Sequence, residues 1–206
     1  VTGQFSASAT FGATTLTSYG SQHAFVMHVS SAGAIDWAIK LGGSAVQSFG
    51  TGITADGLGG GLVVGEFTNT ATFGSSNLTS SGSCDVFVVR VTSLGGVDWV
   101  MQAGGSLSDS GYAIAPDGFG GYSVTGRFRG TATFGSTTLM DSGGGDFDAF
   151  VMHVVVPSSL PPSPPPLSLA PPPSPSPVTT LAGSSQGFAD GTGTAARFHQ
   201  PHGVSV

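Results

Sequence analysis

The sequence predicts an all-β protein built from repeats of about 60 residues. Phe73, followed by glycine, recurs 62 residues earlier as Phe11 and 61 residues later as Phe134. Trp99 recurs 62 residues earlier as Trp37, and an aspartate precedes both. The 206 residues include 34 glycines, and no window of eleven or more residues shows a 3.6-residue apolar period. A fixed period with strand-type patterning indicates stacked β-repeats rather than helices.

The most complete copy, residues 48–105, predicts four short strands separated by turn residues. We place these strands at residues 52–55, 62–67, 86–91 and 97–101. The first ends at Asp56-Gly57, a pair that favours hairpin turns because glycine adopts positive φ at little cost. Alternation along the other strands gives each one apolar face. Four antiparallel strands with one apolar face need a neighbouring unit to cover it.

The predicted core follows from this alternation and from the repeated aromatic residues. Phe87 points to the same face of the third strand as Val89 and Val91. In the fourth strand we expect Val97, Trp99 and Met101 to be buried together. Phe73 lies in an Ala-Thr-Phe-Gly segment, which we interpret as a loop that inserts its phenyl ring. The predicted structural core residues are Phe73, Trp37, Trp99, Phe134 and Phe87.

Composition and charge exclude several classes of partner. The net charge is −6 with 8% charged residues, so the chain would repel a phosphate backbone, and nucleic acid is not expected as a partner. No apolar run approaches the ~20 residues of a membrane-spanning helix, so no membrane span is expected in this segment. The single cysteine, Cys84, makes no internal disulfide. It is either a buried bystander thiol or one half of an intermolecular bridge.

The repeat resembles the units of seven-bladed-type β-propeller repeat proteins. The landmarks are an Asp-Gly turn, a Val-x-Gly-x-Phe strand, the Ala-Thr-Phe-Gly segment, an Asp-x-Phe-Val strand and an Asp-Trp strand, over residues 1 to about 155. One departure is His23, which stands where the other copies have Asp85, interpreted as a turn cap. Another is His28, expected to be half-exposed, where the central copy has Arg90.

This resemblance implies four-stranded antiparallel blades stacked around an axis. Residues 1–156 would then hold about two and a half blades: 1–47 in part, 48–105 in full and 106–156 in part. We expect three, four and three strands in these units, too few to close a propeller, which typically needs 4 to 8 blades. The expected partners are therefore other copies or other segments of the same longer chain.

A linker follows the repeats, because residues 157–177 contain eleven of the thirteen prolines. The segment predicts a polyproline II rod of roughly 65 Å at ~3.1 Å per residue. Its Ser-Pro and Pro-Pro-Pro strings resemble the hydroxyproline-rich glycoproteins of green-algal and plant cell walls and flagellar surfaces. A bare linker and a ligand for a proline-binding domain are the alternatives. The resemblance implies hydroxylation and O-glycosylation at Pro161, Pro162, Pro164, Pro165, Pro166, Pro171, Pro172, Pro173, Pro175 and Pro177.

Residues 178–206 resemble the opening half of an NHL-type β-propeller repeat. The frame is Thr-Leu-Ala-Gly, then Gly-x-x-Asp-Gly-x-Gly, then Ala-x-Phe-x-x-Pro-x-Gly-Val. The sequence supplies it at Thr180, Leu181, Ala182, Gly183, Gly187, Asp190, Gly191, Gly193, Ala196, Phe198, Pro201, Gly203 and Val204. Because the match stops halfway through the repeat, we expect the start of a second propeller in a longer protein.

No set of residues predicts catalysis, so an enzyme, a metal and a cofactor are not expected. His199 and His202 have no identifiable third ligand, although some NHL-type propellers hold metal in lyases. Residues 143–148 faintly resemble calcium-binding Gly-Asp repeats but occur once, which favours a plain loop. Asn77 begins the only N-glycosylation acceptor, Asn-Leu-Thr, in a predicted loop.

Two classes of function remain. The first is a structural extracellular glycoprotein, in which a glycosylated polyproline rod spaces β-repeat modules in a fibre, a cell wall or a flagellar hair. The second is a propeller module of a cell-surface receptor that binds a sugar or protein ligand. Both place the chain outside the cell, with extracellular glycans or matrix proteins as further partners. Aromatic side chains exposed in a cleft would favour the second class.

Overall fold

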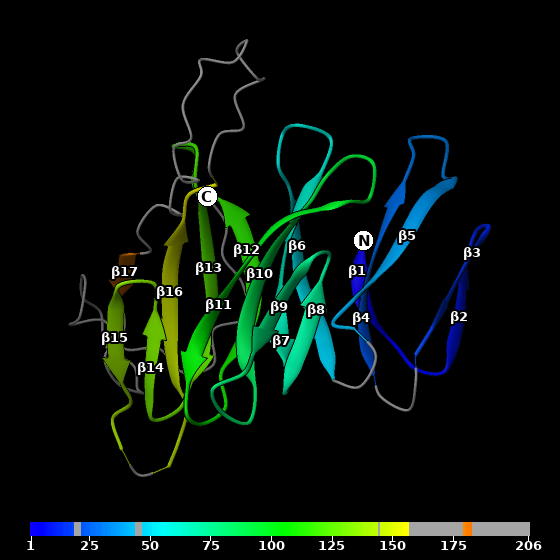
Figure 1. The fold of residues 1–206 in the computed structure, drawn as a ribbon. Coiled ribbons are helices and arrows are strands. Elements are labelled where there is room, and N and C mark those ends of the chain that lie inside the picture. The colour runs from blue at the N-terminus through cyan, green and yellow to red at the C-terminus, as the bar shows by residue number, and fades with distance from the viewer. Residues whose placement is uncertain (19–21, 44–46, 144, 157–178, 183–206) are drawn as a thin grey trace, which may run out of the picture.

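The computed structural model describes residues 1–18, 22–43, 47–143, 145–156 and 179–182, and all of its regular elements are β-strands. Every pair of strands is antiparallel, apart from an isolated parallel bridge between Cys84 and Ser108. Figure 1 shows the units side by side in chain order, from the blue first unit through the green second to the yellow third. The chain is therefore an all-β protein of repeated antiparallel sheets, as predicted.

The second unit contains a four-stranded sheet and a separate hairpin. Its sheet strands run in the order β6, β7, β10, β11, with bounds Ser48–Ala55, Gly61–Phe67, Asp85–Val91 and Val97–Gly105. Between β7 and β10 the chain forms the hairpin of β8 (Thr70–Phe73) and β9 (Ser76–Thr79). The predicted Ala-Thr-Phe-Gly loop is therefore wrong. Ala71 and Phe73 alternate with two exposed threonines, and Gly74 closes the turn at φ +62°.

The first and third units repeat this plan. In the first, the sheet order is β1 (Thr2–Phe5), β4 (His23–Val29), β5 (Ile35–Leu41), with the hairpin β2 (Ser8–Phe11) and β3 (Thr14–Thr17). In the third, β12 (Ser110–Pro116), β13 (Tyr122–Phe128) and β16 (Asp148–Val154) accompany the hairpin β14 (Thr131–Phe134) and β15 (Thr137–Met140). A fourth strand, β17 (Thr179–Ala182), pairs with β16, whereas three sheet strands were expected in this unit.

A β-bulge corrects the predicted face of the fourth strand. Arg90 lies opposite Trp99 and Val91 lies opposite Val97, so Asp98 is the extra residue in β11. Strict alternation therefore breaks between Val97 and Trp99. Val97 packs towards the first unit, while Trp99 packs towards the third. The expectation that both are buried on one face is wrong for this reason.

Two apolar cores hold the units face to face, and we call them the first and second seams. The first seam joins the first and second units through Ala24, Val26, Leu41, Val63, Phe67, Ala71, Phe73, Phe87, Val89 and Val91. The second joins the second and third units through Leu62, Val64, Val86, Val88, Ala103, Ile114, Tyr122, Val124, Phe128, Ala132, Phe134, Phe150, Met152 and Val154. Of the predicted core residues, Phe73, Phe87 and Phe134 are fully buried in these seams, while Trp37 and Trp99 are half-buried at their margins.

Each unit carries the same three-phenylalanine cluster. In the second unit, Phe73 meets Phe67 edge-on at 5.8 Å between ring centroids and lies 4.8 Å from Phe87. The third unit repeats this with 5.8 Å and 4.4 Å, and the first with 6.4 Å and 4.6 Å. The hairpin places the central ring of each cluster over its own sheet. These clusters are the structural meaning of the repeated Phe-Gly in the sequence.

Candidate functional site

A groove of about 240 Å³ opens at one end of the first seam. Its walls come from the first unit and from the β6–β7 hairpin of the second unit. They include Val1, Met27, His28, Trp37, Ile53 and Gly60. Apolar side chains and glycine backbone make up most of this wall, with His28 as its ionisable side chain. The groove is therefore suited to a neutral, partly apolar ligand.

Trp37 lies at the rim of the groove, but neither face of its indole is free. The His28 ring stacks on one face, 5.8 Å away between centroids. A Cβ built on Gly95 would lie 3.0 Å from the indole, so the turn of the second unit covers the other side. The indole Nε1 also donates a hydrogen bond of 2.9 Å to the carbonyl oxygen of Ser93. Trp37 acts as a peg between two units and offers no surface on which a sugar ring could stack.

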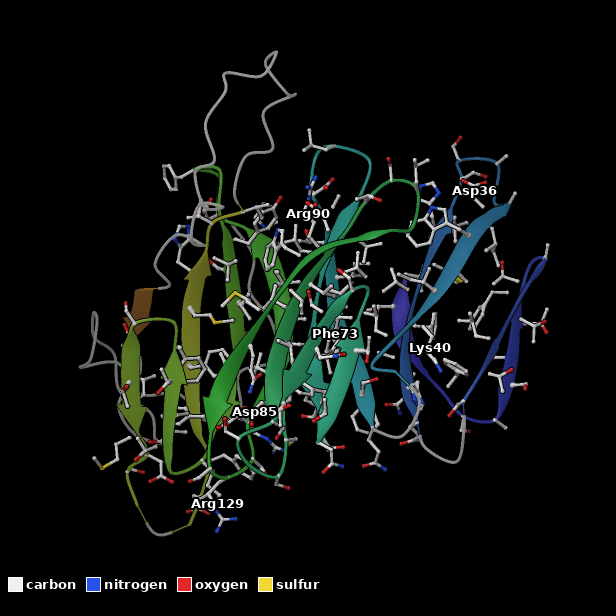
Figure 2. The ribbon with its side chains drawn as sticks, in the orientation of Figure 1. Asp36, Lys40, Phe73, Asp85, Arg90 and Arg129 are labelled. Atoms are coloured by element: carbon white, nitrogen blue, oxygen red, sulfur yellow. The ribbon has the colours of Figure 1, made fainter. Side chains whose placement is uncertain are left out.

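A basic residue near the end of the third sheet strand pairs with aspartate in all three units. Figure 2 shows Arg90 and Asp36 at the same end of the stack. Arg90 donates to Asp56 at 2.9 Å and to Asp98, His28 pairs with Asp36 at 2.7 Å, and His153 pairs with Asp117. Asp36 and Asp98 are both bulge residues, and the bulge re-aims each carboxylate towards its base. These clasps tie strand ends to turns.

The environments of two clasp aspartates explain their charge at neutral pH. Burial raises the pKa of Asp56, but the N–H groups of Leu58 and Gly60 and the Arg90 guanidinium outweigh it, so the pKa falls below its ordinary value. The N–H of Phe119 lowers the pKa of Asp117 in the same way, with further help from His153. Both carboxylates accept two backbone hydrogen bonds. These groups are structural caps of the Asp-Gly turns.

Two carboxylates meet at the opposite end of the second seam. A Cβ built on Gly104 would lie 2.8 Å from both Asp85 and Asp109. Burial raises the pKa of Asp109 to about 6, and the charge of Asp85 adds to the rise, while the N–H groups of Gly105 and Arg129 oppose it. Figure 2 shows Asp85 at this lower end, far from Arg90. No group of three or more potential metal ligands occurs among the residues that the structure describes.

Asp85 has the role of a turn cap that its sequence context predicts. Its carboxylate accepts hydrogen bonds from the Ser80 hydroxyl and from the N–H of Ser81 at 3.1 Å. Gln102 of β11 donates a further bond of 2.6 Å. In the third unit Asp148 accepts from Ser142 in the same manner. The aspartate thus fixes the entry into the third sheet strand.

Asn77 and Cys84 lie in neighbouring parts of the second unit. Asn77 is exposed in β9, not in a loop as predicted, because the segment pairs with β8 as a hairpin. Its side-chain oxygen accepts a hydrogen bond of 2.8 Å from the Thr72 hydroxyl. Cys84 is a half-buried free thiol, and burial raises its pKa. A raised pKa leaves the thiol protonated and less reactive at neutral pH.

Several predicted sites lie outside the described residues. They are the proline series from Pro161 to Pro177 and the pair His199 and His202. The clasps were not foreseen from the sequence, although Asp-Trp in two copies is a signal for the bulge. The free edge of β1, described below, was also missed. It becomes visible only when the three sheets are compared.

The chain matches no protein-family model and no curated protein. Within the described ranges, no helix long and apolar enough to cross a membrane is found. The functional argument therefore depends on the architecture of the stack and on the composition of the segment after it.

Proposed function

We propose that this chain is a segment of a structural extracellular glycoprotein. In this proposal its β-repeats are propeller-type blades, spaced from an NHL-type module by a hydroxylated and glycosylated proline rod. The observation that supports it most is the combination of face-to-face repeats with a segment holding eleven of thirteen prolines. Compact modules joined by stiff spacers suit a fibre, a cell wall or a flagellar hair.

The composition of the three hairpins supports an external, neutral surface. Residues 8–17, 70–79 and 131–140 contain no charged residue. Their exposed hydroxyls pair across the strands, as between Thr10 and Thr15 at 3.0 Å and between Thr70 and Thr79 at 2.9 Å. Such rows stabilise hairpins without attracting charged partners. In our proposal the partners are other copies, other segments of the longer chain, and extracellular glycans or matrix proteins.

Mass spectrometry of the chain isolated from its native source tests this proposal. We expect the peptide spanning residues 157–177 to be heavier than its sequence by hydroxyl and sugar increments. An unmodified mass would overturn the glycoprotein proposal. Antibody labelling of intact cells gives a second readout, and labelling only after permeabilisation would contradict the extracellular location.

The groove at the first seam favours a second candidate, a binding module for a small neutral ligand. Its apolar lining and its half-exposed His28 fit an uncharged sugar or a short peptide. A glycan array probed with the labelled protein tests the sugar, with His28→Ala as the variant that should lose binding. Unchanged binding by this variant would place the sugar elsewhere on the protein.

A further inference from the structure

The strand β1 has one edge that pairs with no strand in the described part of the chain. The first sheet has the order β1, β4, β5, which leaves β1 outermost. The corresponding strands of the other units are flanked on both sides, β7 by β6 and β10, and β13 by β12 and β16. An edge strand presents unpaired N–H and C=O groups to any extended segment.

Printed hydrogen bonds identify which groups face this edge. Val1 and Met27 exchange two backbone bonds of 2.9 Å, so they form a hydrogen-bonded pair. Such pairs alternate along an antiparallel ladder, and Gly3 is therefore the next residue bonded to β4. The backbone groups of Thr2 and Gln4 then point away from β4. Their equivalents in the second unit are Val64 and Glu66, which lie opposite β6 residues.

Side-chain exposure shows that the place of a strand beside β1 is open. Val1 is 55% exposed, whereas its equivalents Val63 and Val124 are 0% exposed. Ile53 of β6 is 36% exposed, whereas its equivalent Ile114 of β12 is 6% exposed. Val63 is covered because Ile53 lies opposite it on β6. Two apolar residues that an inner strand would cover are thus open only at the first unit.

The groove lies between these two exposed residues. Val1 forms one wall, and residues 53–55 of β6 with glycines 59–61 form the opposite one. In the second seam β12 packs against β6 and β7, so the corresponding place is filled by a strand. The groove is therefore the unfilled end of a strand position.

We infer that the free edge of β1, together with this groove, is a binding site for an extended peptide strand of the same kind as β6 and β12. The strand docks antiparallel to β1 and exchanges backbone hydrogen bonds with Thr2 and Gln4. Its end covers Val1 and Ile53. The site stands whether or not the chain belongs to an extracellular assembly, so it goes beyond the proposed function.

The chemistry of the docking strand follows from β6 and β12, which have the sequences SFGTGITA and SGYAIAP. Neither contains a charged residue, and both begin with a buried serine. Ser48 donates to the carbonyl oxygen of Leu41 at 2.8 Å and accepts from the N–H of Ala24 at 3.0 Å. Small residues are needed where units approach, since a Cβ on Gly50 would lie 2.2 Å from the Thr2 hydroxyl. The partner is thus an uncharged, glycine-containing segment.

A labelled synthetic peptide with the sequence of residues 48–57 tests the inference against the full 206-residue protein. We expect saturable binding by fluorescence anisotropy, with protection of the Thr2 and Gln4 amides from hydrogen exchange. A scrambled peptide is the control for composition, and a peptide carrying Gly50→Val and Gly52→Val tests the need for close approach. Equal binding of all three peptides, or no binding of the first, would overturn the inference.

Variants of the protein locate the site on β1. Gln4→Pro removes an N–H that faces the free edge and leaves the Gly3 pairing with β4 in place. We expect at least a tenfold loss of peptide affinity for Gln4→Pro and none for Gln4→Ala. If Gln4→Pro does not fold, peptides N-methylated on alternate residues replace it. Only methylation of the set that faces β1 should abolish binding, and equal effects of both sets would refute the site.

Discussion

The first unit and the two units behind it carry the same phenylalanine cluster under different cover. In the second and third units all six phenylalanines of the clusters are 0% exposed, because an aliphatic face of the preceding unit lies over them. In the first unit Phe11 and Phe25 are half-buried, yet their rings keep the 4.6 Å contact. The sheet and hairpin of one unit thus set the geometry of a cluster, whereas a neighbour sets its burial.

The largest test of this comparison removes the central ring. Phe73→Ala should lower the free energy of unfolding by about 3–5 kcal/mol, because a fully buried ring leaves a cavity. Phe11→Ala removes the equivalent half-buried ring and should cost only about 1–2 kcal/mol. Chemical denaturation measures both. Equal midpoints for the two variants would show that the neighbouring unit does not provide the cover.

A smaller effect is expected at the glycine beneath each cluster. A Cβ on Gly65 would lie 1.8 Å from the Phe49 carbonyl oxygen and 2.8 Å from the Phe87 ring. A Cβ on Gly3 would meet only the Phe25 ring, at 3.0 Å. Gly65→Ala should therefore cost about 1–3 kcal/mol, the usual range for overpacking, and Gly3→Ala clearly less. Thermal unfolding distinguishes them, and a larger loss for Gly3→Ala would contradict the free edge of β1.

The two tryptophans allow a finer comparison between the seams. Trp37 donates its indole N–H to Ser93, while the buried Nε1 of Trp99 has no partner. Trp37→Phe should cost about 1 kcal/mol more than Trp99→Phe, because only the first loses a hydrogen bond. Urea denaturation of both variants measures the difference. A larger loss for Trp99→Phe would mean that its indole is satisfied in solution.

The lower ends of the seams should differ in their response to pH. The second seam has Asp85 and Asp109, where the first has His23 and Gln47. The pKa of Asp109 is raised to about 6 in the folded protein, so the folded state binds its proton more tightly than the unfolded state. This contribution stabilises the fold as pH falls from above 6 towards the unfolded value of 3.8, and it is lost as pH rises through 6.

Asp109→Asn isolates that contribution. Between pH 7 and pH 4.5 the wild type should gain stability relative to the variant, as measured by denaturation at each pH. Gln47→Ala, at the equivalent position of the first seam, is the control and should run parallel to the wild type. A difference between wild type and Asp109→Asn that does not change with pH would contradict the raised pKa.

The sequence predicted what depends on local alternation and missed what depends on long-range pairing. The repeat, the all-β class and the β7 and β10 strands followed from period-two patterns around Gly65 and Phe87. The hairpin of Phe73 was taken for a loop, because strands of four residues give only two repeats of the pattern. The bulge at Asp98 adds one residue without changing composition, so its effect on Val97 could not be read from alternation. The Arg90 clasp and the free edge of β1 need three-dimensional neighbours.

Pairing between β11 and β14 has a mechanical consequence for the stack. Gly104 and Gly105 of the second unit pair with Thr133 and Ala132 of the third, so one hydrogen-bonded sheet crosses the second seam. At the first seam the N–H of Gly42 donates to the carbonyl oxygen of Thr72 at 3.0 Å. A force that pulls neighbouring units apart must break these bonds while it exposes the apolar seam. The units therefore share tension through backbone as well as side chains, and the stack resists bending as a single beam.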